Sequence, residues 1–275
     1  MPVPSPTDVV LRGEVRLPRF GLGVFRMPSG AATRSLVKEA LAVGYRHIDT
    51  ARVYGNEEDV ADGIRDSGLP RDQVFVTTKL WNDDQGYDST LRAFDAALKR
   101  MRLDTIDLYL LHWPVPGKRK ESWRALERLR AEGRARAIGV SNFMEHHLEE
   151  LLGYAHELPS VNQIEVSPFL QQRGVRTLCE RHGIVIEAYS PLTKGARLSH
   201  PEVQRVAKSV GRTPAQVLLA WGLHHGLVVL PKSSQRARLA ENLAAIDVKL
   251  GADEMVALDA LEEGLVTGWD PRKAP

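Results

Sequence analysis

Cysteine is almost absent from this chain, because Cys179 is the only one among 275 residues. A single thiol cannot form an internal disulfide, and it cannot build a zinc site from several thiolates. We therefore expect a reducing, cytoplasmic environment. Two adjacent histidine pairs remain as metal ligands to consider, at 146–147 and 224–225. Neighbours on a helix point to different faces, so the sequence predicts no metal site.

An excess of charge of either sign is also missing, since 37 lysines and arginines stand against 35 aspartates and glutamates. This balance offers no broad basic field to hold nucleic acid or an anionic membrane. No apolar run approaches the roughly 18 to 20 residues of a membrane span. The N-terminal Met-Pro-Val-Pro-Ser-Pro stretch has neither the positive start nor the apolar centre of a signal peptide.

Short apolar or β-branched runs recur along the chain, separated by segments with helical periodicity. The eight runs lie at residues 19–24, 46–51, 74–80, 106–112, 135–141, 161–166, 184–190 and 227–232. This alternation fits a (β/α)8 TIM barrel, whose parallel strands are buried on both faces. No linker marks a boundary, so we expect one domain over residues 1–275. Two apolar segments, 9–11 and 15–17, predict a β-hairpin that covers the bottom of the barrel.

Two helices carry clear sequence signals. Residues 33–43 have helical periodicity and are followed by Gly44, which is placed to end the helix. Leu91, Phe94, Leu98 and Met101 form one stripe, and Asp88 is the expected N-cap.

An open, doubly wound sheet shows the same alternation and is the alternative fold. Its glycine fingerprint, GxGxxG, should follow the first strand, yet the segment at 21–26 ends in Arg26 and no other segment fits.

Polar side chains stand where three consecutive predicted strands end. Asp49 ends the second strand with Tyr54 just beyond it, Lys79 ends the third, and His112 ends the fourth. The strand ends of a TIM barrel converge on one mouth, so these four side chains should meet. A buried Lys79 ammonium would lower the pKa of the Tyr54 phenol and make it a general acid, and Asp49 would hold the lysine charged. None of the four can supply two electrons, so carbonyl reduction would need a nicotinamide cofactor.

Several motifs closely resemble those of aldo-keto reductases, in family order over nearly the whole chain. They lie at residues 44–57, 78–81, 111–114, 138–142, 162–163, 188–192 and 230–242. The resemblance implies a TIM barrel, NADPH bound without a Rossmann turn, and a catalytic tetrad of Asp49, Tyr54, Lys79 and His112. The pattern looks like that of bacterial members related to diketogluconate reductases. It implies a monomer that takes a small carbonyl substrate.

The resemblance also implies where NADPH/NADP+ would bind. Ser141, Asn142 and Gln163 would hold the nicotinamide carboxamide, and Tyr189 would stack on the ring. Ser190 and Leu192 would offer backbone groups to the pyrophosphate. The remaining cofactor contacts implied are Lys232, Ser233, Arg238, Glu241 and Asn242. Lys232, Ser233 and Arg238 at a helix start supply more charge than a ribose hydroxyl needs, which favours NADP(H).

The substrate pocket is expected to have an aromatic wall of Phe25, Trp81 and Trp113 beside His112. The leading hypothesis is NADPH-dependent reduction of aldehydes and ketones to alcohols, with Tyr54 as general acid. A Schiff-base aldolase that uses Lys79 is one alternative. A non-catalytic, redox-sensing regulatory subunit is the other. The closing segment at 269–272 either reaches the mouth or ends as a frayed terminus.

Overall fold

The computed structural model describes residues 8–274, and seven of the eight predicted strand regions overlap a strand of more than two residues in it. The strands are β3 (Leu22–Gly23), β4 (His47–Asp49), β5 (Phe75–Leu80), β6 (Ile106–Leu111), β7 (Ala135–Ser141), β8 (Val161–Glu165), β9 (Val185–Tyr189) and β10 (Val228–Leu230). Neighbours pair in parallel from β3 to β10. A bridge from Phe20 to Val229, with Gly21 N donating to Val229 O at 3.0 Å, closes the ring. The TIM barrel is thereby confirmed, and the open-sheet alternative is wrong.

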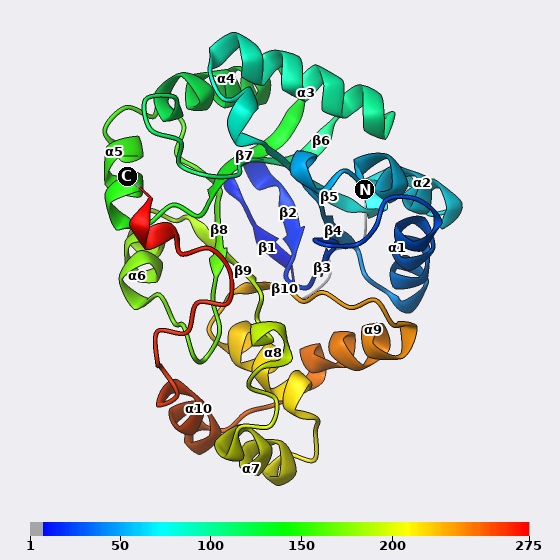
Figure 1. Ribbon diagram of the computed structural model, residues 1–275, viewed down its shortest axis with the longest axis vertical. Coiled ribbons are helices and arrows are strands. Elements are labelled where there is room, and N and C mark those ends of the chain that lie inside the picture. Colours follow the sequence, from blue (N-terminus) through cyan, green and yellow to red (C-terminus); the bar gives the residue numbers. More distant parts are fainter. Residues whose placement is uncertain (1–7, 275) are drawn as a thin grey trace.

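The predicted hairpin is also confirmed. Strands β1 (Asp8–Val10) and β2 (Arg16–Pro18) pair antiparallel, and Figure 1 shows them lying across the centre of the strand ring. Leu11 and Val15 lie between the two strands and Leu17 lies within β2. All three pack against the starts of barrel strands, including Phe75 and Val161. Because this cluster is apolar and buried, the hairpin seals the amino-terminal end of the barrel. The first seven residues, which carry the prediction about a signal peptide, lie outside the described part.

Helices surround the strands (Figure 1). They are α1 (Ala31–Val43), α2 (Glu57–Asp66), α3 (Tyr87–Met101), α4 (Arg119–Ala131), α5 (Glu145–Leu152), α6 (Arg173–Arg181), α7 (Pro201–Ser209), α8 (Pro214–His224), α9 (Arg236–Leu243) and α10 (Ala252–Asp259). Gly44 ends α1 at φ 122°, as predicted. The expected cap of α3 is wrong, because Gly86 is the N-cap and Asp88 lies in the first turn. None of the helices between residues 8 and 274 has the length and apolar character that a membrane crossing requires.

The barrel interior changes from apolar to polar along its axis. Successive residues of a strand face opposite sides, so His47 shares a face with Asp49, and Glu187 shares one with Tyr189. The buried apolar cluster under the hairpin fills the lower end. Buried polar side chains occupy the upper strand positions, so the carboxyl ends of the strands frame a polar site.

Candidate active site

Asp49 and Lys79 form a buried ion pair at the ends of β4 and β5. The Lys79 Nζ donates to Asp49 Oδ1 and Oδ2, each at 2.7 Å, and to the Thr50 carbonyl at 2.8 Å. Burial by itself lowers the pKa of Lys79, but Asp49, with Tyr54 and Glu187, outweighs this and leaves the pKa raised. The lysine therefore carries its positive charge at neutral pH.

Tyr54 ends a short 3-10 turn, η2 (Arg52–Tyr54), directly after β4. The turn is held by buried Asn56, whose Nδ2 donates to the Val24 carbonyl at 3.1 Å and whose Oδ1 accepts from Thr50 Oγ1 at 2.7 Å. Lys79 Nζ lies 5.1 Å from the centre of the Tyr54 ring.

The acidity of Tyr54 differs from the sequence prediction. Its surroundings desolvate the phenol and raise its pKa above the ordinary value, while the Lys79 charge acts to lower it. The prediction that Lys79 acts to lower the pKa of Tyr54 is right. The prediction that this pKa is lowered overall is wrong, because desolvation raises it by more than Lys79 lowers it. Tyr54 is thus fully protonated at neutral pH, which is the state that a proton donor needs.

His112 follows β6 and brings its ring to the same place. The ring centroid is 5.8 Å from that of Tyr54 and 5.3 Å from that of Trp81, both edge-on. Burial, and secondly the Lys79 charge, hold the pKa of His112 well below its usual range. The imidazole is neutral and can donate one hydrogen bond without adding charge.

Hydrogen bonds connect these groups to the ends of the next strands. Asn142 Nδ2 donates to the His112 carbonyl at 2.9 Å and to Ser141 Oγ at 3.1 Å, while Tyr189 Oη donates to Asn142 Oδ1 at 2.8 Å. Gln163 Nε2 donates to Asp49 Oδ2 at 2.8 Å. As the strand order predicts, the structure brings four of the expected cofactor-binding residues to the tetrad: Ser141, Asn142, Gln163 and Tyr189.

Sequence reasoning missed Glu187, which is completely buried on β9 and accepts from Gln163 Nε2 at 2.5 Å. The sequence does contain a signal for Glu187, because it stands two residues before Tyr189 in the same strand and so faces the same side. A charged residue that points into a parallel barrel is unusual.

The remaining residues expected to hold a cofactor follow β9 and β10. Ser190 and Leu192 lie in a tight turn, where their carbonyls accept from Thr193 N and Gly195 N. Ser233 and Asn242 are buried, Lys232 and Arg238 are exposed, and Glu241 accepts from Thr213 Oγ1 at 2.7 Å.

A cavity of about 480 Å³ opens beside the end of β10. Arg26, Lys232 and Ser234 line it together with apolar Met27 and Leu36. The following helix, α9, has Gln235 as its N-cap and no side-chain cap, which leaves N–H groups of its first turn open to an anion. The carboxylate of Glu39 also lines the cavity, so its two cations face one negative charge. The net positive charge and the hydroxyl of Ser234 still suit a phosphate-bearing nucleotide.

The expected aromatic wall is present in part. Phe25 is half exposed and its ring centroid lies 5.0 Å from that of Tyr54, so it stands beside the tetrad as Trp81 does. Trp113 faces Trp269 of the C-terminal segment, with ring centroids 5.8 Å apart.

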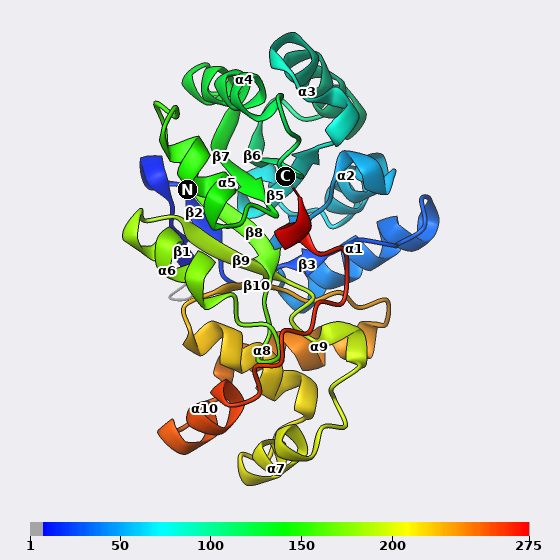
Figure 2. The same ribbon diagram turned by 60° about the vertical axis from the view of Figure 1, so that its left-hand side comes forward.

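The C-terminal segment is anchored along this end of the barrel. Thr267 N donates to Glu165 at 3.0 Å. Figure 2 shows the segment, in red, running from α10 toward α5, where the rings of His146 and His147 approach the Ala274 carbonyl. Those two rings lie 3.8 Å apart, so the prediction that they point to different faces is wrong. Two alternatives were predicted for residues 269–272, a segment that reaches the mouth of the barrel and a frayed terminus. The structure supports the first, because Trp269 contacts Trp113.

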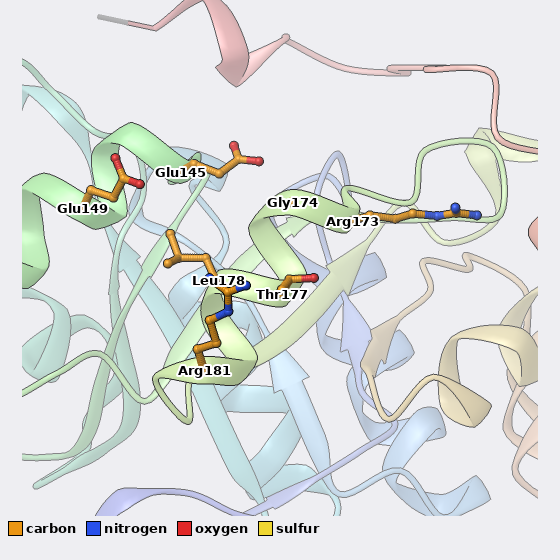
Figure 3. A pocket seen from close by; sticks show the side chains of 7 residues that line it. All are labelled: Glu145, Glu149, Arg173, Gly174, Thr177, Leu178 and Arg181. Carbon is orange, nitrogen blue, oxygen red and sulfur yellow. The ribbon is translucent and has the colours of Figure 1, made fainter.

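A second hollow, of about 390 Å³, lies outside the mouth between α5 and α6. Figure 3 shows Glu145 and Glu149 on α5, and Arg173 on α6 pointing away from them. No predicted site residue lines it. Across residues 8–274 no three histidines, cysteines or carboxylates gather as metal ligands.

Comparison with known proteins gives one consistent result. The model of the "Aldo/keto reductase family" matches residues 20–263. The glyoxal reductase of Bacillus subtilis is 46% identical over 271 residues, covering 98% of each chain. The 9,11-endoperoxide prostaglandin H2 reductase of Trypanosoma cruzi is 47% identical over 266 residues, covering 96% of this chain and 94% of that protein. A crystal structure of a Gox0644 mutant in complex with NADPH superposes with a TM-score of 0.92 at 43% identity, covering 99% of this chain and all of that one.

Proposed function

This chain belongs to the aldo/keto reductase family, and from that premise we propose that it reduces aldehydes and ketones to alcohols with NADPH. One observation carries the proposal: Tyr54 stands against the Lys79 ammonium and beside the neutral His112 ring at the mouth of the barrel. A protonated phenol next to a fixed cation suits proton donation to an oxygen that becomes negatively charged.

In the proposed mechanism the protein handles the carbonyl oxygen. His112 donates a hydrogen bond that orients the carbonyl, and Tyr54 donates its proton to the oxygen as negative charge develops. Lys79 stabilises the phenolate that remains, and Asp49 fixes the lysine by accepting from its ammonium with both carboxylate oxygens. NADPH, when bound, supplies the hydride that the carbonyl carbon receives.

We assign the nicotinamide end of the cofactor to Ser141, Asn142, Gln163 and Tyr189. The Gln163 amide nitrogen already serves Asp49 and Glu187, so its oxygen is the atom that remains for a carboxamide N–H. The phosphate end we assign to Ser190, Leu192, Lys232, Ser233, Arg238, Glu241 and Asn242.

The substrates we propose are small aldehydes, dicarbonyls and keto sugars, as in diketogluconate-reductase-like members. The 46% identity to a glyoxal reductase supports small dicarbonyls, and the short connection from β6 to α4 leaves little room for specificity loops. We further propose that the chain is one domain and acts as a cytoplasmic monomer. The buried Cys179, whose pKa burial raises to about 12, is consistent with a thiol kept for packing.

Tyr54→Phe tests the role of the phenol. Turnover of NADPH with glyoxal-type and aromatic aldehydes should fall by about 10² to 10⁴-fold, while NADPH binding, measured by fluorescence titration, stays unchanged. Retained turnover would remove Tyr54 as the proton donor. A wild-type protein that binds NADPH but oxidises it with no carbonyl compound would instead favour the regulatory subunit.

Lys232→Ala tests the choice of cofactor. Loss of a charged contact to the 2′-phosphate should weaken NADPH binding by about 10 to 100-fold and leave NADH binding unchanged. Lys208→Ala, on the remote helix α7, is the matched control. Equal losses for both cofactors would refute the assignment.

The aldolase alternative is weakened by the bonding of Lys79. A Schiff base needs a neutral amine, whereas Asp49 holds this lysine charged and its pKa is raised. Borohydride trapping of a carbonyl compound on Lys79 would restore that alternative.

A further inference from the structure

A second carboxyl group lies inside the barrel next to the proposed catalytic pair. Glu187 on β9 is completely buried, and Gln163 on β8 links it to Asp49. The single amide nitrogen of Gln163 donates to Asp49 Oδ2 at 2.8 Å and to Glu187 Oε2 at 2.5 Å. Because an amide nitrogen has two hydrogens, both are used, and the two carboxyl groups share one donor.

The available positive charge is already neutralised. The Lys79 ammonium donates to both carboxylate oxygens of Asp49 and to the Thr50 carbonyl, so its charge is paired with Asp49. A second carboxylate in this dry interior would have no direct cationic partner and would stand close to a first one. One of the two carboxyl groups must then hold a proton, and the ion pair identifies Asp49 as the ionised one.

The other neighbours of Glu187 offer no compensating charge. His47 on β4 places Nε2 at 3.6 Å from Glu187 Oε1 and at 3.0 Å from Thr77 Oγ1. Burial lowers the pKa of His47 to about 3, so this ring is neutral. On the other side β10 presents apolar Val228 in register with Glu187. Burial, and then the Asp49 charge, raise the pKa of Glu187 to about 8, which agrees with this account.

We propose that Glu187 is a positioning residue which, as a neutral carboxylic acid, fixes Gln163 and keeps the charge beneath Tyr54 balanced for proton donation. The proposal rests on the proposed reductase function. When Glu187 loses its proton, the site gains one negative charge. That charge opposes formation of the Tyr54 phenolate, so Tyr54 becomes a weaker acid and reduction slows. The alkaline decline of activity would then belong to Glu187, and not to the tyrosine itself.

Glu187→Gln is the direct test, because glutamine has the same shape and is always neutral. Below the Glu187 pKa the variant should keep kcat/KM within about threefold of wild type. Wild-type kcat/KM should decline with a midpoint of about 8, and the variant should lack that decline. Glu187→Leu removes the acceptor for one hydrogen of the Gln163 amide, so this variant should have a lower kcat at every pH.

Infrared spectroscopy gives a readout that does not depend on turnover. Wild-type protein should show the carbonyl stretch of a protonated carboxylic acid at neutral pH, and Glu187→Gln should lack it. Glu165→Gln is the matched control, since Glu165 is also buried, on the adjacent strand β8, but bonds Thr267. This control should keep both the band and the alkaline decline.

Two results would overturn the proposal: a Glu187→Gln pH profile that matches wild type throughout, or an infrared spectrum in which Glu187 is ionised at neutral pH. If wild-type protein reduces no carbonyl compound, the proposed function fails, and the infrared arm still decides the protonation state of Glu187.

Discussion

Replacing Lys79 with methionine perturbs the interior of the barrel most sharply, because it removes a charge and keeps most of the volume. Lys79 is 1% exposed, and its ammonium bonds Asp49 and the Thr50 carbonyl. In the variant the Asp49 carboxylate keeps the Gln163 amide as its side-chain donor among residues 8–274. Glu187 shares that amide, so the stranded charge has a carboxyl group as its nearest neighbour.

The size of the loss follows from this burial. Removing one partner of a buried ion pair typically costs about 3 to 5 kcal/mol, since the remaining charge stays desolvated without compensation. With a denaturant slope of about 3 kcal/mol per molar urea, the unfolding midpoint should fall by roughly 1 to 1.7 M. Acid should recover part of the loss, because it neutralises the stranded carboxylate.

Urea unfolding of four proteins measures this directly: wild type, Lys79→Met, Asp49→Asn and the double variant. The double variant should lose less than the sum of the two single losses, because neither charge is then left alone in the interior. Additive losses, or a Lys79→Met midpoint equal to that of wild type, would refute the argument that this pair is electrostatically coupled in a dry site.

Two further predictions concern stability. The folded-state pKa of Glu187, about 8, lies above the ordinary glutamate value, so its contribution is fully present below that ordinary value and is lost as pH rises through about 8. Urea midpoints of Glu187→Gln relative to wild type should therefore rise between about pH 5 and pH 8. Leu17 of the hairpin is completely buried under the barrel. Leu17→Ala should cost about 2 to 5 kcal/mol in thermal unfolding and leave the turnover of the folded enzyme unchanged, because the cavity forms at the end away from the mouth.

The barrel could be predicted from the sequence because each strand is a buried apolar run, whereas helix caps depend on distant contacts. The start of α3 illustrates the difference. Gly86 adopts φ 128°, and its N–H donates to Ser122 Oγ of α4 at 2.8 Å. That contact joins residues 36 positions apart, so the local sequence around Asp88 contains no sign that the N-cap lies two residues earlier, at Gly86.

The positions of the site residues could be predicted from the strand ends. The effect of burial on their pKa values could not be predicted from the sequence. Asp49 ends β4, Lys79 is the last residue but one of β5, and His112 follows β6. Barrel geometry alone brings such residues together. The direction of the Tyr54 pKa shift was predicted wrongly, because the sequence shows a nearby cation but not that desolvation raises the pKa by more than the cation lowers it. Glu187 was missed because a charged residue inside a strand carries no motif, although its two-residue spacing from Tyr189 reveals the face it occupies.

Strand register explains why the ammonium stands between a carboxylate and a phenol. Asp49 pairs with Thr77 across β4 and β5, so Lys79 is the next inward position toward the mouth. Two residues along a strand rise about 6.6 Å, and the lysine stem is long enough to fold back to Asp49 while its ammonium stays 5.1 Å from the Tyr54 ring centre. A shift of one residue would turn Lys79 out of the barrel, since side chains alternate between faces. The chemistry of the site is therefore determined by the pairing of two strands as much as by the residues on them.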